Sequence, residues 1–194
     1  MKAIQIPTAK ELVKELEPLG SEGYRKVLRN HGVPEPMFGV KVEDLKKIQK
    51  RVKKDHLLAI DLYDTGIYDA RYLAGLVADE SKMTEMDLRH WLATANCAAL
   101  CQFTIPWVAA ETEYGHELAL EWIDAADEHA AIAGWSTLGS LVSIMHSATR
   151  RSSSFILRTP LVGPSGPMPR MLRWSWLSAA LVGPHRFRRT GNAL

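Results

Sequence analysis

Apolar residues recur at helical spacing through the first 146 residues, with helix-start signals between successive runs. Thr8 with Glu11, and Thr84 with Asp87, each have the spacing of a capping box, in which two side chains satisfy backbone groups at a helix start. No run alternates apolar with polar residues as a half-buried strand does, and no Asn-Gly hairpin turn is present. The pattern therefore predicts an all-α chain.

The expected helices are short and the turns between them are also short. Such helices form antiparallel pairs, and stacked pairs build either an α-solenoid or a compact bundle. The expected helices begin at Thr8, at Ser21, at residue 42 (running to 54), at residue 55 (ending near Thr65), at Asp69, at Thr84 and at Asn96 (ending before Pro106), and then cover residues 107–110, 116–126 and 129–145.

Charge divides the chain of 194 residues into two parts that its net charge of +2 conceals. Residues 1–146 hold 16 Lys and Arg against all 22 acidic residues, whereas residues 147–194 hold eight Arg, no Lys and no acid. We therefore predict a helical domain over 1–146 and an irregular basic tail rich in Pro, Ser and Arg over 147–194. Two interpretations of the tail stay open, an out-of-frame segment of a GC-rich coding sequence and a disordered arm for nucleic acid.

The expected helix at residues 42–54 carries the most distinctive surface. Its apolar residues Leu45, Ile48 and Val52 form one narrow stripe, and six cations occupy the opposite arc. Such an arc can neutralise several phosphates, although a solvated basic face is the ordinary alternative. The candidate DNA-binding residues are Lys46, Lys47, Lys50, Arg51, Lys53 and Lys54.

Other chemistries find little support in the sequence. Cys97 and Cys101 cannot make a disulfide framework, so we expect an intracellular, cytoplasmic protein with two buried structural cysteines and no bound metal or cofactor. The uncharged stretch 130–149 contains many small polar residues, which favours a buried helix over a membrane span. Glycine-rich phosphate loops and hydrolase motifs are absent. We expect the acidic turn at Asp127 to cap the helix that follows it.

Several segments in a fixed order resemble one known family. They are Met37-Phe38-Gly39-Val40 followed by the basic helix, residues 69–74, residues 84–102 and residues 121–138. Over roughly residues 20–145 the chain resembles the DNA alkylation repair family of AlkD-like DNA glycosylases. The resemblance implies a solenoid of HEAT-like helix pairs with a basic concave groove for double-stranded DNA. Active members of the family excise cationic alkylated purines without a metal ion.

The catalytic positions of that family are replaced in this chain. The family's Trp-Asp-x-x-Asp segment corresponds to residues 98–102, which puts Ala98 at the Trp position and Gln102 at the catalytic Asp position. The family's later Arg corresponds to Ile132. Cleavage of a glycosidic bond builds positive charge on the sugar, which a carboxylate stabilises and a neutral amide does not. We therefore expect a DNA-binding protein with lost or altered catalysis; an active glycosylase of alkylated purines and a protein-interaction scaffold are the alternatives.

Overall fold

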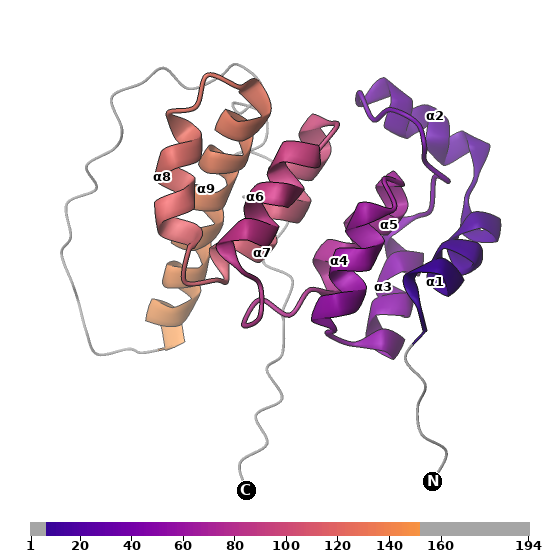
Figure 1. The fold of residues 1–194 in the computed structure, drawn as a ribbon, viewed down its shortest axis with the longest axis horizontal. Coiled ribbons are helices and arrows are strands. Elements are labelled where there is room, and N and C mark those ends of the chain that lie inside the picture. Colours follow the sequence, from indigo (N-terminus) through magenta and orange to yellow (C-terminus); the bar gives the residue numbers. More distant parts are fainter. Residues whose placement is uncertain (1–6, 152–194) are drawn as a thin grey trace, which may run out of the picture. The chain divides into compact units, whose positions relative to one another are not determined.

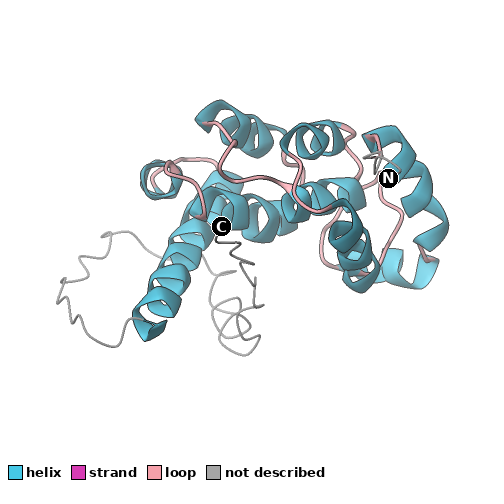
Figure 2. Ribbon diagram, turned by 90° about the horizontal axis from the view of Figure 1, so that it is seen from below, coloured by secondary structure: helices cyan, strands magenta, loops and turns pink. Residues whose placement is uncertain are grey.

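The computed structural model describes residues 7–151, with side chains described as far as residue 146. Within this range the chain forms only helices (Figures 1 and 2), so the all-α prediction is confirmed. The helices are α1 (Ala9–Leu16), the 3-10 helix η1 (Glu17–Leu19), α2 (Glu22–Asn30), α3 (Val42–Val52), α4 (His56–Asp64), α5 (Tyr68–Val77), α6 (Glu85–Thr94), the π-helix η2 (Leu100–Thr104), α7 (Ile105–Ala110), α8 (Gly115–Ile123) and α9 (Glu128–Arg151).

The chain divides into two units, Met1–Val142 and Ser143–Leu194, and the fold described below is that of the first. Helix α9 runs to Arg151 and so passes the boundary predicted at residue 146. Residues 152–194, on which both interpretations of the tail depend, lie outside the described residues. None of the helices over residues 7–151 combines the length and apolarity that a membrane span needs.

Helix pairs follow one another along the first unit (Figure 1). Helix α4 packs against α5, α6 packs against α7, and α7 also contacts α8. Helix α9 approaches α8 so closely that a Cβ atom added at Gly134 would lie 2.8 Å from the carbonyl oxygen of Ala119. Helix α5 is the central element, since it contacts α1, α3, η2 and α7.

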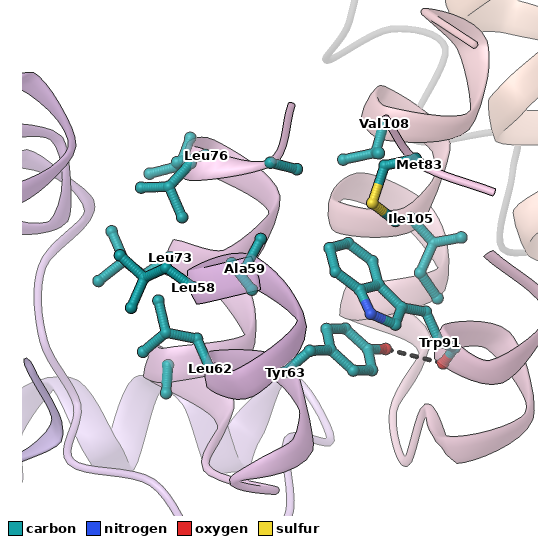
Figure 3. Packing of buried hydrophobic residues seen from close by; sticks show 14 of the residues in the cluster. Leu58, Ala59, Leu62, Tyr63, Leu73, Leu76, Met83, Trp91, Ile105 and Val108 are labelled. Atoms are coloured by element: carbon teal, nitrogen blue, oxygen red, sulfur yellow. Dashed lines mark hydrogen bonds between the residues drawn. The ribbon is translucent and has the colours of Figure 1, made fainter. Parts of the chain in front are cut away.

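The core joins the middle pairs through one aromatic stack as well as through aliphatic packing (Figure 3). The rings of Tyr63 in α4 and Trp91 in α6 lie 4.3 Å apart at an interplanar angle of 6°. The Tyr63 hydroxyl donates a 2.8 Å hydrogen bond to the backbone carbonyl of Trp91. A buried aromatic ring thus gains stacking while its one polar atom is satisfied.

Two of the segments that carry the family resemblance meet in this unit. The Asp69 carboxylate is 1% exposed and accepts backbone N–H bonds from Phe38 at 2.6 Å, Gly39 at 3.3 Å and Val40 at 2.7 Å. It therefore holds the Phe-Gly-Val segment against the start of α5. Both segments have a structural role here, because the Asp69 carboxylate is buried and both of its oxygens accept backbone hydrogen bonds.

The neighbouring Arg71 is also buried. Its guanidinium donates to the carbonyl oxygen of Tyr63 at 3.0 Å and to that of Thr94 at 2.9 Å, and lies 4.9 Å from the Tyr63 ring centroid. Arg71 thereby ties the ends of α4 and α6 to α5. A buried cation is tolerated there because helix-terminal carbonyls need donors.

The predicted helix starts at Thr8 and Thr84 are confirmed, since both capping boxes form with both of their reciprocal bonds. Asp127 accepts the N–H of Ala130 at 2.8 Å, as expected of a cap for α9.

Other helix boundaries differ from the prediction. Helix α5 begins at Tyr68, one residue before the predicted start. The prediction that a helix ends before Pro106 was wrong. The π-helix η2 runs directly into α7, and Pro106 lies within α7. Pro106 has no backbone N–H to donate, and the wider turn of a π-helix directly precedes it.

Candidate nucleic-acid interface

Helix α3 is amphipathic as its sequence indicates. Leu45, Ile48 and Val52 are buried in the core, and two acidic residues, Glu43 and Asp44, stand in the first turn where the helix dipole favours them. The helix ends at Val52 rather than Lys54, since Lys53 adopts a φ of 67° that no helical residue has. The last two candidate cations therefore lie in the turn that follows α3.

Three of the six candidate cations are paired with acidic residues. Lys47 contacts Asp44 at 2.6 Å, and both terminal nitrogens of Arg51 bond to Glu15 of α1, at 3.0 and 2.6 Å. The Asp44 carboxylate raises the pKa of Lys47, and the Glu15 carboxylate raises the pKa of Arg51. Lys54 contacts Glu80. These pairs offset part of the positive charge that a ligand would meet.

The other three cations, Lys46, Lys50 and Lys53, contact no carboxylate in the part of the chain that the structure describes. Lys50 and Lys53 are exposed and Lys46 is half-buried. Lys46 and Lys50 stand one helical turn apart, so their ammonium groups share a face. These three residues are the cations of α3 best placed to receive phosphates.

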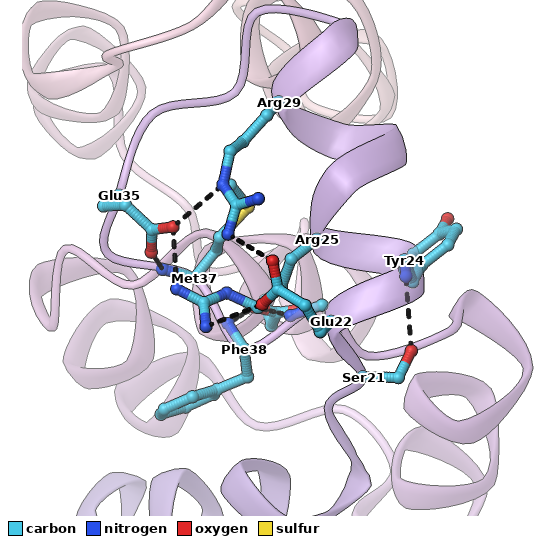
Figure 4. Close-up of polar contacts among 10 residues, drawn as sticks. Ser21, Glu22, Tyr24, Arg25, Arg29, Glu35, Met37 and Phe38 are labelled. Carbon is cyan, nitrogen blue, oxygen red and sulfur yellow. Dashed lines mark hydrogen bonds and ion pairs between the residues drawn. The ribbon is translucent and has the colours of Figure 1, made fainter.

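Cations on α2 are paired in a similar way (Figure 4). Arg25 contacts Glu22 at 3.2 Å and Glu35 at 2.8 Å, while Arg29 contacts Glu22 at 2.9 Å. The Glu35 carboxylate also accepts the backbone N–H of Met37 at 3.1 Å, which anchors the loop before the Phe-Gly-Val segment. This network stabilises the loop and offsets the charges of Arg25 and Arg29.

Helix α5 also contributes to a row of aromatic rings that we did not predict from the sequence. We call Tyr68, Tyr72, Phe103 and Trp107 the aromatic row. Tyr68 and Tyr72 lie 6.4 Å apart, Tyr72 meets Trp107 edge-on at 5.8 Å, and Phe103 lies 5.8 Å from Trp107. The available sequence signal was the spacing of four residues within each pair, Tyr68 with Tyr72 and Phe103 with Trp107. Burial raises the pKa of Tyr72 to about 12.

The three residues that the family resemblance predicts at the catalytic positions, Ala98, Gln102 and Ile132, carry no acidic side chain. Ala98 and Gln102 are half-buried, and Gln102 lies within η2 directly before Phe103 of the aromatic row. Ile132 is 3% exposed and packs in the core with residues of α8, so its side chain faces away from solvent. Among the residues with described side chains, no cluster of three His, Cys, Asp or Glu could hold a metal ion.

Comparison with known proteins places the chain in a family. The family model described as DNA alkylation repair enzyme matches residues 12–152, and the chain therefore belongs to that family. Two uncharacterized proteins, Lin0241 of Listeria innocua and Lmo0209 of Listeria monocytogenes, are each 29% identical over 133 residues, which is 66% of this chain. The chain spans 59% of the length of these relatives.

One solved structure has a fold similar to that of this chain. The comparison gives a TM-score of 0.68 and 34% sequence identity, and it covers 76% of this chain and 64% of the chain in that structure. That protein is described as one of a new family of proteins related to the HEAT-like repeat DNA glycosylases with affinity for branched DNA structures. The predicted HEAT-like solenoid is thus confirmed, and so is the resemblance to the DNA alkylation repair family.

Proposed function

We propose that this protein binds double-stranded DNA through α3 and does not excise alkylated bases by the family's carboxylate mechanism. The observation that carries the proposal is the set of three cations, Lys46, Lys50 and Lys53, without acidic partners among the described residues of a DNA repair family member. Lysine side chains of this kind bind phosphate oxygens and release counterions from the DNA.

Loss of excision follows from the residues at the catalytic positions. A neutral amide at Gln102 cannot stabilise the positive charge that develops on the deoxyribose. The buried Ile132 cannot clamp a phosphate as the family's arginine would. We therefore propose recognition of DNA without glycosidic cleavage.

The form of DNA is proposed from the solved relative. Because that protein is described as one of a new family with affinity for branched DNA structures, we propose that this chain also prefers a branch point over a continuous duplex. We propose the cytoplasm as its compartment, since Cys97 and Cys101 are both free thiols.

Reversal of charge on α3 tests the DNA contact. In Lys46→Glu/Lys50→Glu the two cations become anions, and we expect DNA affinity to fall by about tenfold or more. The slope of log affinity against log salt should also decrease by about 1.8, which is about 0.9 for each lost phosphate contact. Affinity is measured by fluorescence anisotropy across a salt series.

The matched control is Lys10→Glu/Lys14→Glu on α1. It changes the net charge by the same amount at the same helical spacing, so it reproduces the general electrostatic effect without altering α3. Equal losses of affinity in both variants would show that α3 has no specific role.

A second assay tests the catalytic part of the proposal. The protein is incubated with DNA that contains 7-methylguanine, and release of the free base is measured by chromatography. We expect no release above that of DNA alone, because no carboxylate stands at the Gln102 position. Enzyme-dependent release would instead select an active glycosylase, and Gln102→Ala would then show whether this amide takes part.

A further inference from the structure

We infer that Phe103 and Trp107 form a stacking site for an unpaired nucleobase at a DNA branch point. This inference rests on the proposed function and adds the chemical group that the aromatic row contacts. It assigns phosphate contacts to α3 and base contacts to the segment η2–α7.

The two rings are presented to solvent in a defined orientation. Phe103 is 41% exposed and Trp107 is 38% exposed, and over residues 7–146 they are the aromatic side chains that reach this level of exposure. Their centroids lie 5.8 Å apart with the planes tilted by 47°. Tyr72 meets Trp107 at an interplanar angle of 87°, which braces the indole from α5. A braced ring loses little freedom when a ligand stacks on it.

Exposed rings of this kind need a partner with an accessible flat face. Every nucleobase has such a face, but a continuous duplex hides it between neighbouring base pairs. A branch point leaves bases unstacked or unpaired, so their faces are free. This favours an unpaired base over intact duplex as the group that the pair receives.

The surroundings of the pair suit an uncharged base better than a phosphate. The side chains that the proposal places at this surface, Gln102, Phe103 and Trp107, carry no charge. The neighbouring Gln102 amide carries both donor and acceptor atoms, which fits the edge of a neutral base.

Helix α5 contacts both α3 and the η2–α7 segment. The central helix thus links a basic element to an aromatic one. The ligand that the proposal assigns is a strand whose backbone lies on α3 and whose unpaired base lies on Trp107. This arrangement fits a nucleic acid better than a protein partner, which would need no phosphate contacts.

The test uses a three-way DNA junction with one unpaired 2-aminopurine at the branch, and the same junction with an abasic site at that position. For the wild type, we expect removal of the base to weaken binding by about 5- to 150-fold, the range for one stacked base. Binding of the intact junction should quench 2-aminopurine fluorescence.

Trp107→Ala should bind the intact and the abasic junction with equal affinity, while Trp107→Phe should retain most of the difference. Phe103→Ala provides a second variant if Trp107→Ala fails to fold. Leu57→Ala on α4 is the control, because this apolar side chain is also exposed but lies outside the aromatic row. It should behave as the wild type does.

Each outcome has a separate meaning. Equal affinity of the wild type for both junctions would overturn the stacking site while leaving DNA binding intact, and would assign the exposed rings to a protein partner. The same would follow if Trp107→Ala lost equal affinity for both junctions. No binding of either junction by the wild type would overturn the proposed function, and the stacking site with it.

Discussion

Asp69 shows how one side chain can fix the geometry of a functional surface without taking part in chemistry. Its carboxylate accepts three backbone N–H groups from Phe38, Gly39 and Val40. These bonds join the loop before α3 to the start of α5, and hence relate the basic helix to the helix that carries Tyr68 and Tyr72. A buried acidic residue in a repair family invites a catalytic interpretation, but its hydrogen bonds explain it as structural.

Removal of this carboxylate should be costly. In Asp69→Ala, three backbone donors lose their acceptor, two of them buried and one part-buried, and we expect the free energy of unfolding to fall by about 3 kcal/mol. Urea denaturation followed by circular dichroism measures it. Asp61→Ala, which removes an exposed acid from α4, should change stability by less than about 0.5 kcal/mol. Similar stabilities for the two variants would contradict this role of Asp69.

At the scale of elements, the sequence predicted what depends on nearby residues. A capping box joins two residues that are three positions apart, and both capping boxes were correctly located. The helix through Pro106 was missed, because a π-helical turn is set by packing that no local pattern reports. The charge pairs of Arg51 and Lys54 were also missed, since Glu15 lies 36 residues from Arg51 and Glu80 lies 26 residues from Lys54.

Contact between α8 and α9 depends on the absence of a side chain at Gly134. A Cβ atom there would lie 2.5 Å from the nitrogen of Ile123, and backbone atoms cannot move aside cheaply. We expect Gly134→Ala to lower the melting temperature clearly, despite the better helix propensity of alanine. At Gly139, in the same helix, nothing lies within 4 Å of the added atom. Gly139→Ala should therefore stabilise by up to about 1 kcal/mol. A stabilising Gly134→Ala would show that the two helices pack less closely than described.

At the scale of the whole molecule, the sequence predicted the fold better than the interface. Helical spacing and the family resemblance were sufficient for an all-α, HEAT-like unit. The aromatic row was not predicted, because its rings come from α5 and from the η2–α7 segment. Tyr72 and Trp107 are 35 residues apart in the sequence (107 − 72), and only the fold brings them together. Similarly, the pairing of Arg51 and Lys54 depends on Glu15 and Glu80, which lie far from them in the sequence.

The proposed function depends on recognition of DNA shape and charge without cleavage. The most direct measurement is the affinity of the unmodified protein for a three-way junction and for a linear duplex of the same sequence, across a series of salt concentrations. We expect tighter binding to the junction, with log affinity falling linearly as log salt rises, because phosphate contacts release counterions. An affinity that does not respond to salt, or the absence of binding to either DNA, would contradict the proposed function.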